Sequence, residues 1–226
     1  MDRQIHVSRP FFPPLGEYEI YLEQIWKSGI VTHNGPMVQD LEKKLKELLK
    51  VRHIACVSNG TLAIQLAIKA LNLQGEIITT PFTFIATISS VIWEKCKPVF
   101  VDINPYTLNI DENKIEEKIT DNTVGILGVH VFSNPCNTDR IDEIAKKYHL
   151  KVIYDAAHAM HVEYKGKSIF EYGDISTTSF HGTKIFNTIE GGACFSNDVT
   201  LDGKIRELRF FGQDVNKEIV NEGTNA

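Results

Sequence analysis

Short apolar runs alternate with segments of helical periodicity along most of this 226-residue chain. Strands are predicted at residues 53–57, 76–79, 98–101, 124–129, 151–154, 175–180 and 193–196. Helices are predicted at residues 38–48, 62–71, 84–94, 111–119, 139–148 and 201–211. Strands that alternate with helices pair mainly in parallel and carry helices on both faces of the sheet. We therefore predict an α/β fold, a three-layer α/β/α sandwich with a mainly parallel central sheet.

The composition is that of a soluble globular protein, with 42% hydrophobic and 23% charged residues. A formal net charge of -5 gives no broad basic field, so neither nucleic acid nor a membrane surface is an expected partner. Residues 1–6 lack the apolar core of a signal peptide, and no run is long enough to span a bilayer, so we expect a cytoplasmic protein. The four cysteines show no CxxC spacing. We expect them to be reduced and structural, and we predict no metal site.

A phosphate-binding turn is suggested where the strand at residues 53–57 runs into a helix through Ser58-Asn59-Gly60-Thr61. Backbone N–H groups of Gly60 and Thr61 would lie at the helix N-terminus, where free donors and the helix dipole favour a phosphate dianion. The Thr61 hydroxyl would add a donor. The same residues also suit an ordinary capped turn, so both interpretations stay open.

Asp155 and Lys184 together indicate a pyridoxal-phosphate enzyme. Asp155 follows a buried strand, at the end where open α/β sheets place their ligands, and its carboxylate can keep a pyridine nitrogen protonated. Lys184 lies among small, turn-forming residues, and a lysine amine can form a Schiff base with the cofactor aldehyde. Taken singly, the aspartate has the alternative of a helix cap, and the lysine that of a solvated surface residue.

Two rings are further candidates for the same site. His158 can hydrogen-bond the phenolic oxygen of the cofactor, although a lone histidine is more often structural, as we expect of His161 and His181. Phe84 can stack on a flat cofactor ring, but a phenylalanine is usually part of the core, and from the residue alone we favour the core.

These residues belong to a series of ordered motifs that covers nearly all of the chain. The motifs are Thr32-His33-Asn34-Gly35-Pro36, Ser58-Asn59-Gly60-Thr61, Pro81-Phe82-Thr83-Phe84, Pro98-Val99-Phe100-Val101-Asp102-Ile103, Asp155-Ala156-Ala157-His158-Ala159, Ser179-Phe180-His181-Gly182-Thr183-Lys184 and Glu190-Gly191-Gly192. In this series the chain resembles the DegT/StrS family of nucleotide-sugar aminotransferases, within the fold-type I pyridoxal-phosphate enzymes. The resemblance implies one large cofactor-binding domain over residues 1–226, with an N-terminal segment at 1–35. It also implies that the smaller C-terminal domain of full members is absent.

The resemblance implies specific roles for three residues at the reacting centre. Lys184 matches the Schiff-base lysine, which also carries the proton, and its presence marks an aminotransferase because a dehydratase branch has histidine there. Asp155 matches the residue on the pyridine nitrogen, and His158 one near the ring hydroxyl.

The resemblance also implies roles around the cofactor. Gly60, Thr61 and Ser179 match phosphate-binding positions, and Phe84 matches the aromatic residue that stacks on the ring. Asn225 matches an asparagine that reaches the cofactor phosphate of a neighbouring subunit, so a homodimer with shared active sites is implied.

Three positions depart from the usual pattern of the family. Gly182 stands where alanine is common, Ser133 where glycine is common, and Asn137 where aspartate is usual.

The implied activity is transfer of an amino group from L-glutamate to a nucleotide-linked keto-6-deoxysugar in amino-deoxysugar biosynthesis, for surface polysaccharides such as O-antigen or for secreted metabolites. Residues 29–36 and 185–188 are similar to members that act on dTDP-4-keto-6-deoxyglucose, while the choice between C3 and C4 stays open. Two alternatives remain. One is another fold-type I enzyme, such as a lyase or an amino-acid aminotransferase. The other is a catalytically incompetent fragment that serves as a binding or assembly module.

Overall fold

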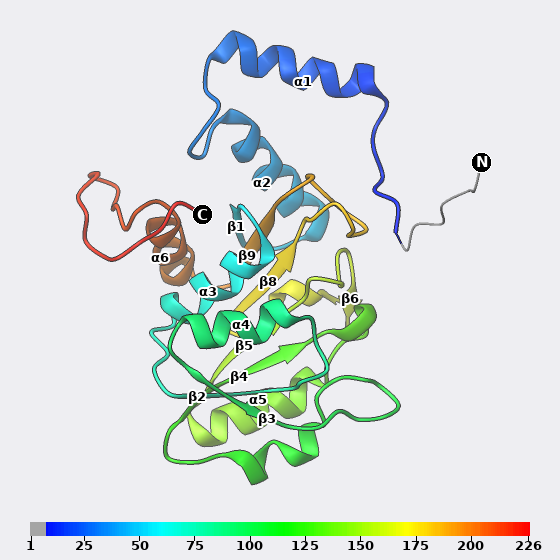
Figure 1. The fold of residues 1–226 in the computed structure, drawn as a ribbon, viewed down its shortest axis with the longest axis vertical. Coiled ribbons are helices and arrows are strands. Elements are labelled where there is room, and N and C mark those ends of the chain that lie inside the picture. The colour runs from blue at the N-terminus through cyan, green and yellow to red at the C-terminus, as the bar shows by residue number, and fades with distance from the viewer. Residues whose placement is uncertain (1–7) are drawn as a thin grey trace.

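The computed structural model describes residues 8–226 (Figure 1). Its α-helices are α1 (Leu15–Ser28), α2 (Pro36–Leu49), α3 (Gly60–Ala70), α4 (Ile85–Trp93), α5 (Thr138–Tyr148) and α6 (Val199–Arg209). Its strands are β1 (His53–Val57), β2 (Glu76–Thr79), β3 (Lys97–Phe100), β4 (Thr123–Val129), β5 (Lys151–Asp155), β6 (Glu163–Tyr164), β7 (Lys167–Ser168), β8 (Ile175–Ser179) and β9 (Gly192–Ser196). Short 3-10 turns are η1 (Glu112–Lys114), η2 (Glu116–Lys118), η3 (Val131–Ser133) and η4 (Ile169–Glu171).

The central sheet of the described chain has seven strands in the order β1-β9-β8-β5-β4-β2-β3. Strands β8, β5, β4, β2 and β3 pair in parallel, whereas β9 runs antiparallel to both of its neighbours, β1 and β8. The predicted mainly parallel sheet is therefore confirmed. Its parallel strands share one carboxyl edge, and the polar motifs follow the strands at that edge.

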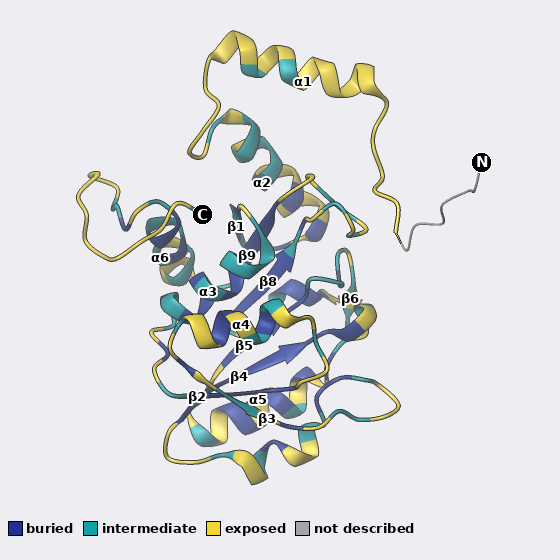
Figure 2. Ribbon diagram, in the orientation of Figure 1, coloured by how far each residue is buried: buried dark blue, intermediate teal, exposed yellow. Residues whose placement is uncertain are grey.

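Consecutive strand residues pack on opposite faces of the sheet, which makes the fold three-layered. Ile77 and Leu127 belong to a core cluster with α3, α4 and α6, while Ile78 and Ile126 belong to a cluster with α5. A third cluster joins α2 to the second face through Leu45. Because the sheet is buried on both faces, these strands appear in the sequence as continuous apolar runs. The predicted three-layer α/β/α sandwich is confirmed (Figure 2).

The prediction of an α-helix at residues 111–119 is wrong. The segment forms the 3-10 turns η1 and η2, closed by i→i+3 bonds from Lys114 N to the Asp111 carbonyl and from Lys118 N to the Ile115 carbonyl. The Asp111 carboxylate also accepts a bond from Asn113 N. A short polar side chain that hydrogen-bonds the adjacent backbone competes with α-helix formation. The spacing of apolar residues gives no information about such a bond.

Helix α1 was not among the predicted elements, and it lies apart from the sheet in Figures 1 and 2. None of its residues is buried, and Trp26 is 79% exposed. A helix of 14 residues is marginal in water without packing. Its apolar side chains therefore require a surface that the described chain does not supply.

Of the three departures from the family pattern, Gly182 and Asn137 fit their surroundings, whereas Ser133 has a strained backbone. A Cβ at Gly182 would lie 3.6 Å or more from any neighbour, so either glycine or alanine is accommodated. Asn137 caps α5 by accepting a bond from Arg140 N, as an aspartate would. Ser133 has a left-handed backbone, with φ 68°, which glycine adopts more readily. All four cysteines are free thiols, as expected. Within residues 8–226, no helix has the length and apolarity to cross a bilayer.

An ion-pair network ties α2 and α6 to β1. The Glu42 carboxylate, 7% exposed, accepts bonds from Arg209 Nη1 at 2.7 Å, Arg206 Nη1 at 2.9 Å and Cys56 N at 2.9 Å. Arg209 also donates to the Cys56 carbonyl. Because both Glu42 and Arg209 are buried, each charge depends on the other for stabilisation.

We expect Glu42→Ala to lower the free energy of unfolding by about 3 kcal/mol, because it leaves the Arg209 cation buried without a counter-charge. Urea titration followed by circular dichroism measures this difference. The matched control is Glu47→Ala, an exposed position on the same helix, for which we expect a change within about 0.5 kcal/mol. Equal effects at the two positions would mean that the network contributes nothing to stability.

Candidate active site

A cavity of about 880 Å³ opens where the carboxyl ends of β4, β5 and β8 meet the N-terminus of α3. The described chain thus brings together residues that are far apart in sequence, such as Gly60 and Lys184, which are 124 positions apart (184 − 60). Seven of the predicted site residues line it: Gly60, Thr61, Phe84, Asp155, His158, Ser179 and Lys184.

Asp155 is the last residue of β5 and is 7% exposed. Its Oδ2 accepts a bond from Thr87 Oγ1 at 2.8 Å, and its Oδ1 accepts one from Ala157 N at 3.0 Å. A carboxylate oxygen can accept two bonds, so acceptor capacity remains on the cavity side. The anion is therefore held in a fixed orientation beside the cavity, and it closes a turn rather than capping a helix.

Sequence reasoning missed the threonine pair that holds Asp155. Thr87 is fully buried on α4, and its hydroxyl also lies 2.8 Å from that of Thr83, one helical turn before it. Buried hydroxyls are normally hydrogen-bonded. A threonine repeated at i and i+4, once before and once within a mainly apolar helix, was the available signal, but it did not reveal the distant partner.

Lys184 lies in the turn between β8 and β9, where its N–H donates to the His181 carbonyl at 2.9 Å. The side chain is part-buried, and this burial lowers the pKa of the amine below its ordinary value, an effect that the Asp155 carboxylate opposes. Lys184 is thus not a freely solvated surface lysine. A lowered pKa makes the neutral, nucleophilic amine more available near neutral pH.

His158 follows Asp155 in the same turn and lines the cavity. Burial lowers the pKa of its imidazole, and the Lys184 cation lowers it further, while Asp155 acts in the opposite direction. The ring is therefore neutral at pH 7 and can act as a hydrogen-bond donor or acceptor.

The N-terminus of α3 and the end of β8 form a close-packed cradle. A Cβ on Gly60 would come within 2.8 Å of Ser179 Cβ, so only glycine fits. Asn59 Oδ1 caps the helix by accepting a bond from Leu62 N at 2.9 Å. The N–H groups of Gly60 and Thr61 have no acceptor within the helix, and with the Ser179 hydroxyl they form a site suited to a phosphate group.

Phe84 is 73% exposed at the start of α4, so the preference for a core position is wrong. Phe82 and Phe132 line the same cavity, and neither is buried. The cavity therefore offers aromatic rings around its polar residues, which suits a flat ligand.

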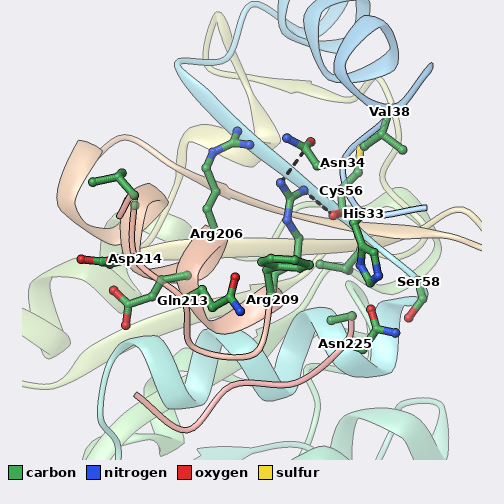
Figure 3. Close-up of a pocket in the computed structure, with 16 residues that line it drawn as sticks. His33, Asn34, Val38, Cys56, Ser58, Arg206, Arg209, Gln213, Asp214 and Asn225 are labelled. Carbon is green, nitrogen blue, oxygen red and sulfur yellow. Dashed lines mark hydrogen bonds between the residues drawn. The ribbon is translucent and has the colours of Figure 1, made fainter. Parts of the chain in front are cut away.

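Asn225 does not line the cavity formed by these seven residues. It is exposed in the wall of a second cavity of about 800 Å³, bounded by α6 and by the segment before α2. Figure 3 shows Asn225 across this cavity from Arg209, whose guanidinium is bonded to Asn34 and to the Cys56 carbonyl. The predicted contact is with a neighbouring subunit, so it stays a prediction.

His130, which sequence reasoning also missed, directly follows β4. It is fully buried, its Nδ1 accepts a bond from Cys136 N at 3.0 Å, and its ring stacks on Tyr154 with centroids 4.7 Å apart. Burial lowers the pKa of its imidazole to about 3. The folded protein therefore holds a neutral histidine beside the site.

We expect His130 to make the fold acid-sensitive. The unfolded chain binds a proton on this side chain near pH 6.5, whereas the folded chain does so only near pH 3. The contribution of neutral His130 to the free energy of unfolding is therefore fully present above pH 6.5. Between pH 6.5 and about pH 3, the free energy of unfolding falls by up to about 1.4 kcal/mol for each pH unit of acidification. Urea unfolding of wild type and His130→Asn at pH 7.5, 5.5 and 4.5 should show a shallower pH slope in the variant. His149→Asn, at the end of α5, should keep the wild-type slope.

Three comparisons with known proteins place this chain among sugar aminotransferase relatives. A profile of the DegT/DnrJ/EryC1/StrS aminotransferase family matches residues 16–225. A dTDP-4-amino-4,6-dideoxy-D-glucose transaminase of Shigella dysenteriae is 51% identical over 94% of this chain and 58% of its own length. A GDP-perosamine synthase of Escherichia coli O157:H7 is 37% identical over 90% of this chain and 57% of its own length.

Among solved structures, that of DesI in the presence of its TDP-sugar product superimposes with a TM-score of 0.94 and 33% identity, covering 99% of this chain and 57% of that one. The chain thus spans somewhat more than half the length of the relatives it matches. With the family profile aligned to almost all of its residues, the chain belongs to the DegT/DnrJ/EryC1/StrS aminotransferase family.

Proposed function

We propose that residues 1–226 are the large, cofactor-binding domain of a pyridoxal-phosphate aminotransferase that moves an amino group from L-glutamate to a nucleotide-linked keto-6-deoxysugar. The observation that carries this proposal is the single cavity that unites the Lys184 amine, the Asp155 carboxylate and the cradle at Gly60 and Ser179. The amine, the carboxylate and the anion-binding cradle that such an enzyme needs thereby line one cavity.

The residues present fit pyridoxal phosphate. When bound, this cofactor supplies an aldehyde that takes up the amino group and a ring that acts as an electron sink. The cradle at Gly60, Thr61 and Ser179 would hold the phosphate, and Asp155 would hold the protonated ring nitrogen. Lys184 Nζ, with its lowered pKa, would take the proton from the α-carbon of the amino donor in the first half-reaction. In the second half-reaction it would deliver a proton to the former ketone carbon of the acceptor sugar, which becomes the carbon that bears the amine.

For the acceptor we propose dTDP-4-keto-6-deoxyglucose, aminated at C4. Support comes from two relatives, 51% and 45% identical, that carry the name dTDP-4-amino-4,6-dideoxy-D-glucose transaminase. GDP-perosamine synthases among the relatives are less similar, at 37% identity or below. The product would then be an amino-deoxysugar nucleotide for a polysaccharide such as O-antigen.

A second copy of the chain is the partner that we propose. Helix α1 buries none of its residues, and α4 exposes Ile85, Ile92 and Trp93 on its outer side. Apolar surface of this kind marks a site of association. A homodimer would cover it, and it would let Asn225 serve the cavity of the neighbouring copy.

The test is a coupled assay of the purified protein, as its gene encodes it, with pyridoxal phosphate, L-glutamate and dTDP-4-keto-6-deoxyglucose. We expect formation of the 4-amino sugar nucleotide, identified by mass spectrometry and NMR. Turnover of amino acids and 2-oxo acids alone would favour another fold-type I enzyme. Cofactor binding without any turnover would favour an incompetent binding module.

A further inference from the structure

Residues 131–134, which follow β4 along the wall of the cavity, have an unusual backbone. Phe132 and Ser133 have φ angles of 50° and 68°, in the left-handed region that non-glycine residues rarely adopt. Two such residues in succession persist only where surrounding contacts fix them, and they are concentrated at functional sites. The contacts of this loop therefore show which residues hold this backbone conformation and which part of the cavity it positions.

Asn109 fixes the loop from outside the cavity. Its side chain is 2% exposed; Oδ1 accepts a bond from Val131 N at 2.9 Å, and Nδ2 donates to the Asn134 carbonyl at 3.0 Å. Asn134 Nδ2 in turn donates to the Thr107 carbonyl at 2.9 Å. These bonds hold both ends of the strained pair. Asn109 itself does not line the cavity, so any influence that it has on the site passes through the loop.

On the cavity side, the loop is attached to the turn that carries His158. The Ser133 hydroxyl donates to the His158 carbonyl. The Phe132 ring is parallel to that of His158, with centroids 6.0 Å apart, and edge-on to that of Phe82 at 6.5 Å. Phe132 nevertheless remains 69% exposed. A large apolar ring is thus held in a defined place on the wall of the cavity, with most of its surface uncovered.

The two substrates of the proposed reaction differ in what they can offer such a ring. Glutamate is a charged, open chain that calls for cations and hydrogen-bond donors. A 6-deoxysugar has a ring with C–H groups on one face and a methyl group, which together form an apolar surface that an aromatic side chain can cover. We propose that Phe132 contacts the sugar ring of the amino acceptor and that Asn109 is the positioning residue that holds it there. This inference rests on the proposed function.

The two half-reactions separate this role from a general one, and both are measured on the protein as its gene encodes it. We expect Phe132→Ala to raise the KM for the keto-sugar about tenfold, while the rate of the glutamate half-reaction stays within about threefold of wild type. Phe132→Tyr should restore the KM. The matched control is Tyr106→Ala, which removes a 94% exposed aromatic side chain from the loop of Asn109, outside the cavity. It should leave both values unchanged.

Asn109→Ala should also raise the KM for the keto-sugar about tenfold, and the double variant Asn109→Ala/Phe132→Ala should be no worse than the more affected single variant. Asn109→Asp keeps an acceptor for Val131 N but loses the donor to Asn134, so it should show a smaller rise and serves if Asn109→Ala does not fold. Additive effects, or equal losses in both half-reactions, would overturn the positioning role.

An unchanged KM for the keto-sugar in Phe132→Ala would overturn the proposed contact between Phe132 and the sugar ring, but it would not contradict the proposed aminotransferase activity. A wild-type protein that aminates no keto-sugar would overturn the proposed function and this inference together.

Discussion

Replacing Lys184 with alanine is expected to abolish covalent attachment of pyridoxal phosphate and to lower the rate of amino transfer by about 10⁴-fold, at the upper end of what a positioned acid–base residue contributes. The structure offers the reason: the amine reaches the same cavity as Asp155, and burial lowers its pKa. No other lysine is among the residues that line this cavity in the described chain.

Borohydride reduction of the protein with its cofactor, followed by peptide mass spectrometry, measures the attachment. Wild type should carry the pyridoxyl group on Lys184, and Lys184→Ala should carry none. Lys43→Ala, an exposed lysine on α2, should behave as wild type in both experiments. A cofactor adduct at another lysine, or full activity in Lys184→Ala, would remove the basis of the assigned site.

The fold was predictable because most strands of a sheet that is buried on both faces are mainly apolar. Strand β2 was predicted at both of its ends, and the single helix that failed, at residues 111–119, failed through local bonds made by Asp111. Helix α1 was not predicted from the sequence, because none of its residues is buried in the described chain and its apolar residues show no periodic face that packs on the sheet. Periodicity detects helices that pack on their own sheet, and it carries no information about a surface that must be covered by something else.

The site was predictable where a residue type stands at a strand end. Asp155 and Ser179 are the last residues of β5 and β8, and the turn at Gly60 follows β1, so the shared edge of the sheet brings them together. Thr87 and Asn109 were not predictable, because each acts through a partner, Asp155 or Val131, that lies 68 or 22 residues away in sequence. The left-handed backbone of Phe132 could not be predicted either, because phenylalanine is not a residue type that favours a positive φ.

Replacing Asp155 with asparagine is expected to lower the rate of amino transfer by about 10²- to 10³-fold, because it removes a preorganised negative charge from a nearly buried position while preserving shape. The amide oxygen can still accept the bond from Ala157 N, and the amide nitrogen can face the Thr87 hydroxyl, which is able to accept as well as donate. The local turn should therefore persist, and the loss should reflect charge rather than unfolding.

Two further variants separate charge from orientation in this prediction. Thr87→Val keeps the Asp155 carboxylate but removes the bond that orients Oδ2, and we expect a loss of about tenfold. Asp121→Asn removes a charge from an exposed turn before β4 and should leave the rate unchanged. Steady-state kinetics with saturating pyridoxal phosphate, together with unfolding curves for each variant, give the comparison. If Asp155→Asn stays within tenfold of wild type, the carboxylate does not stabilise a charged ring nitrogen, because that stabilisation is the only part of its role that the asparagine cannot reproduce.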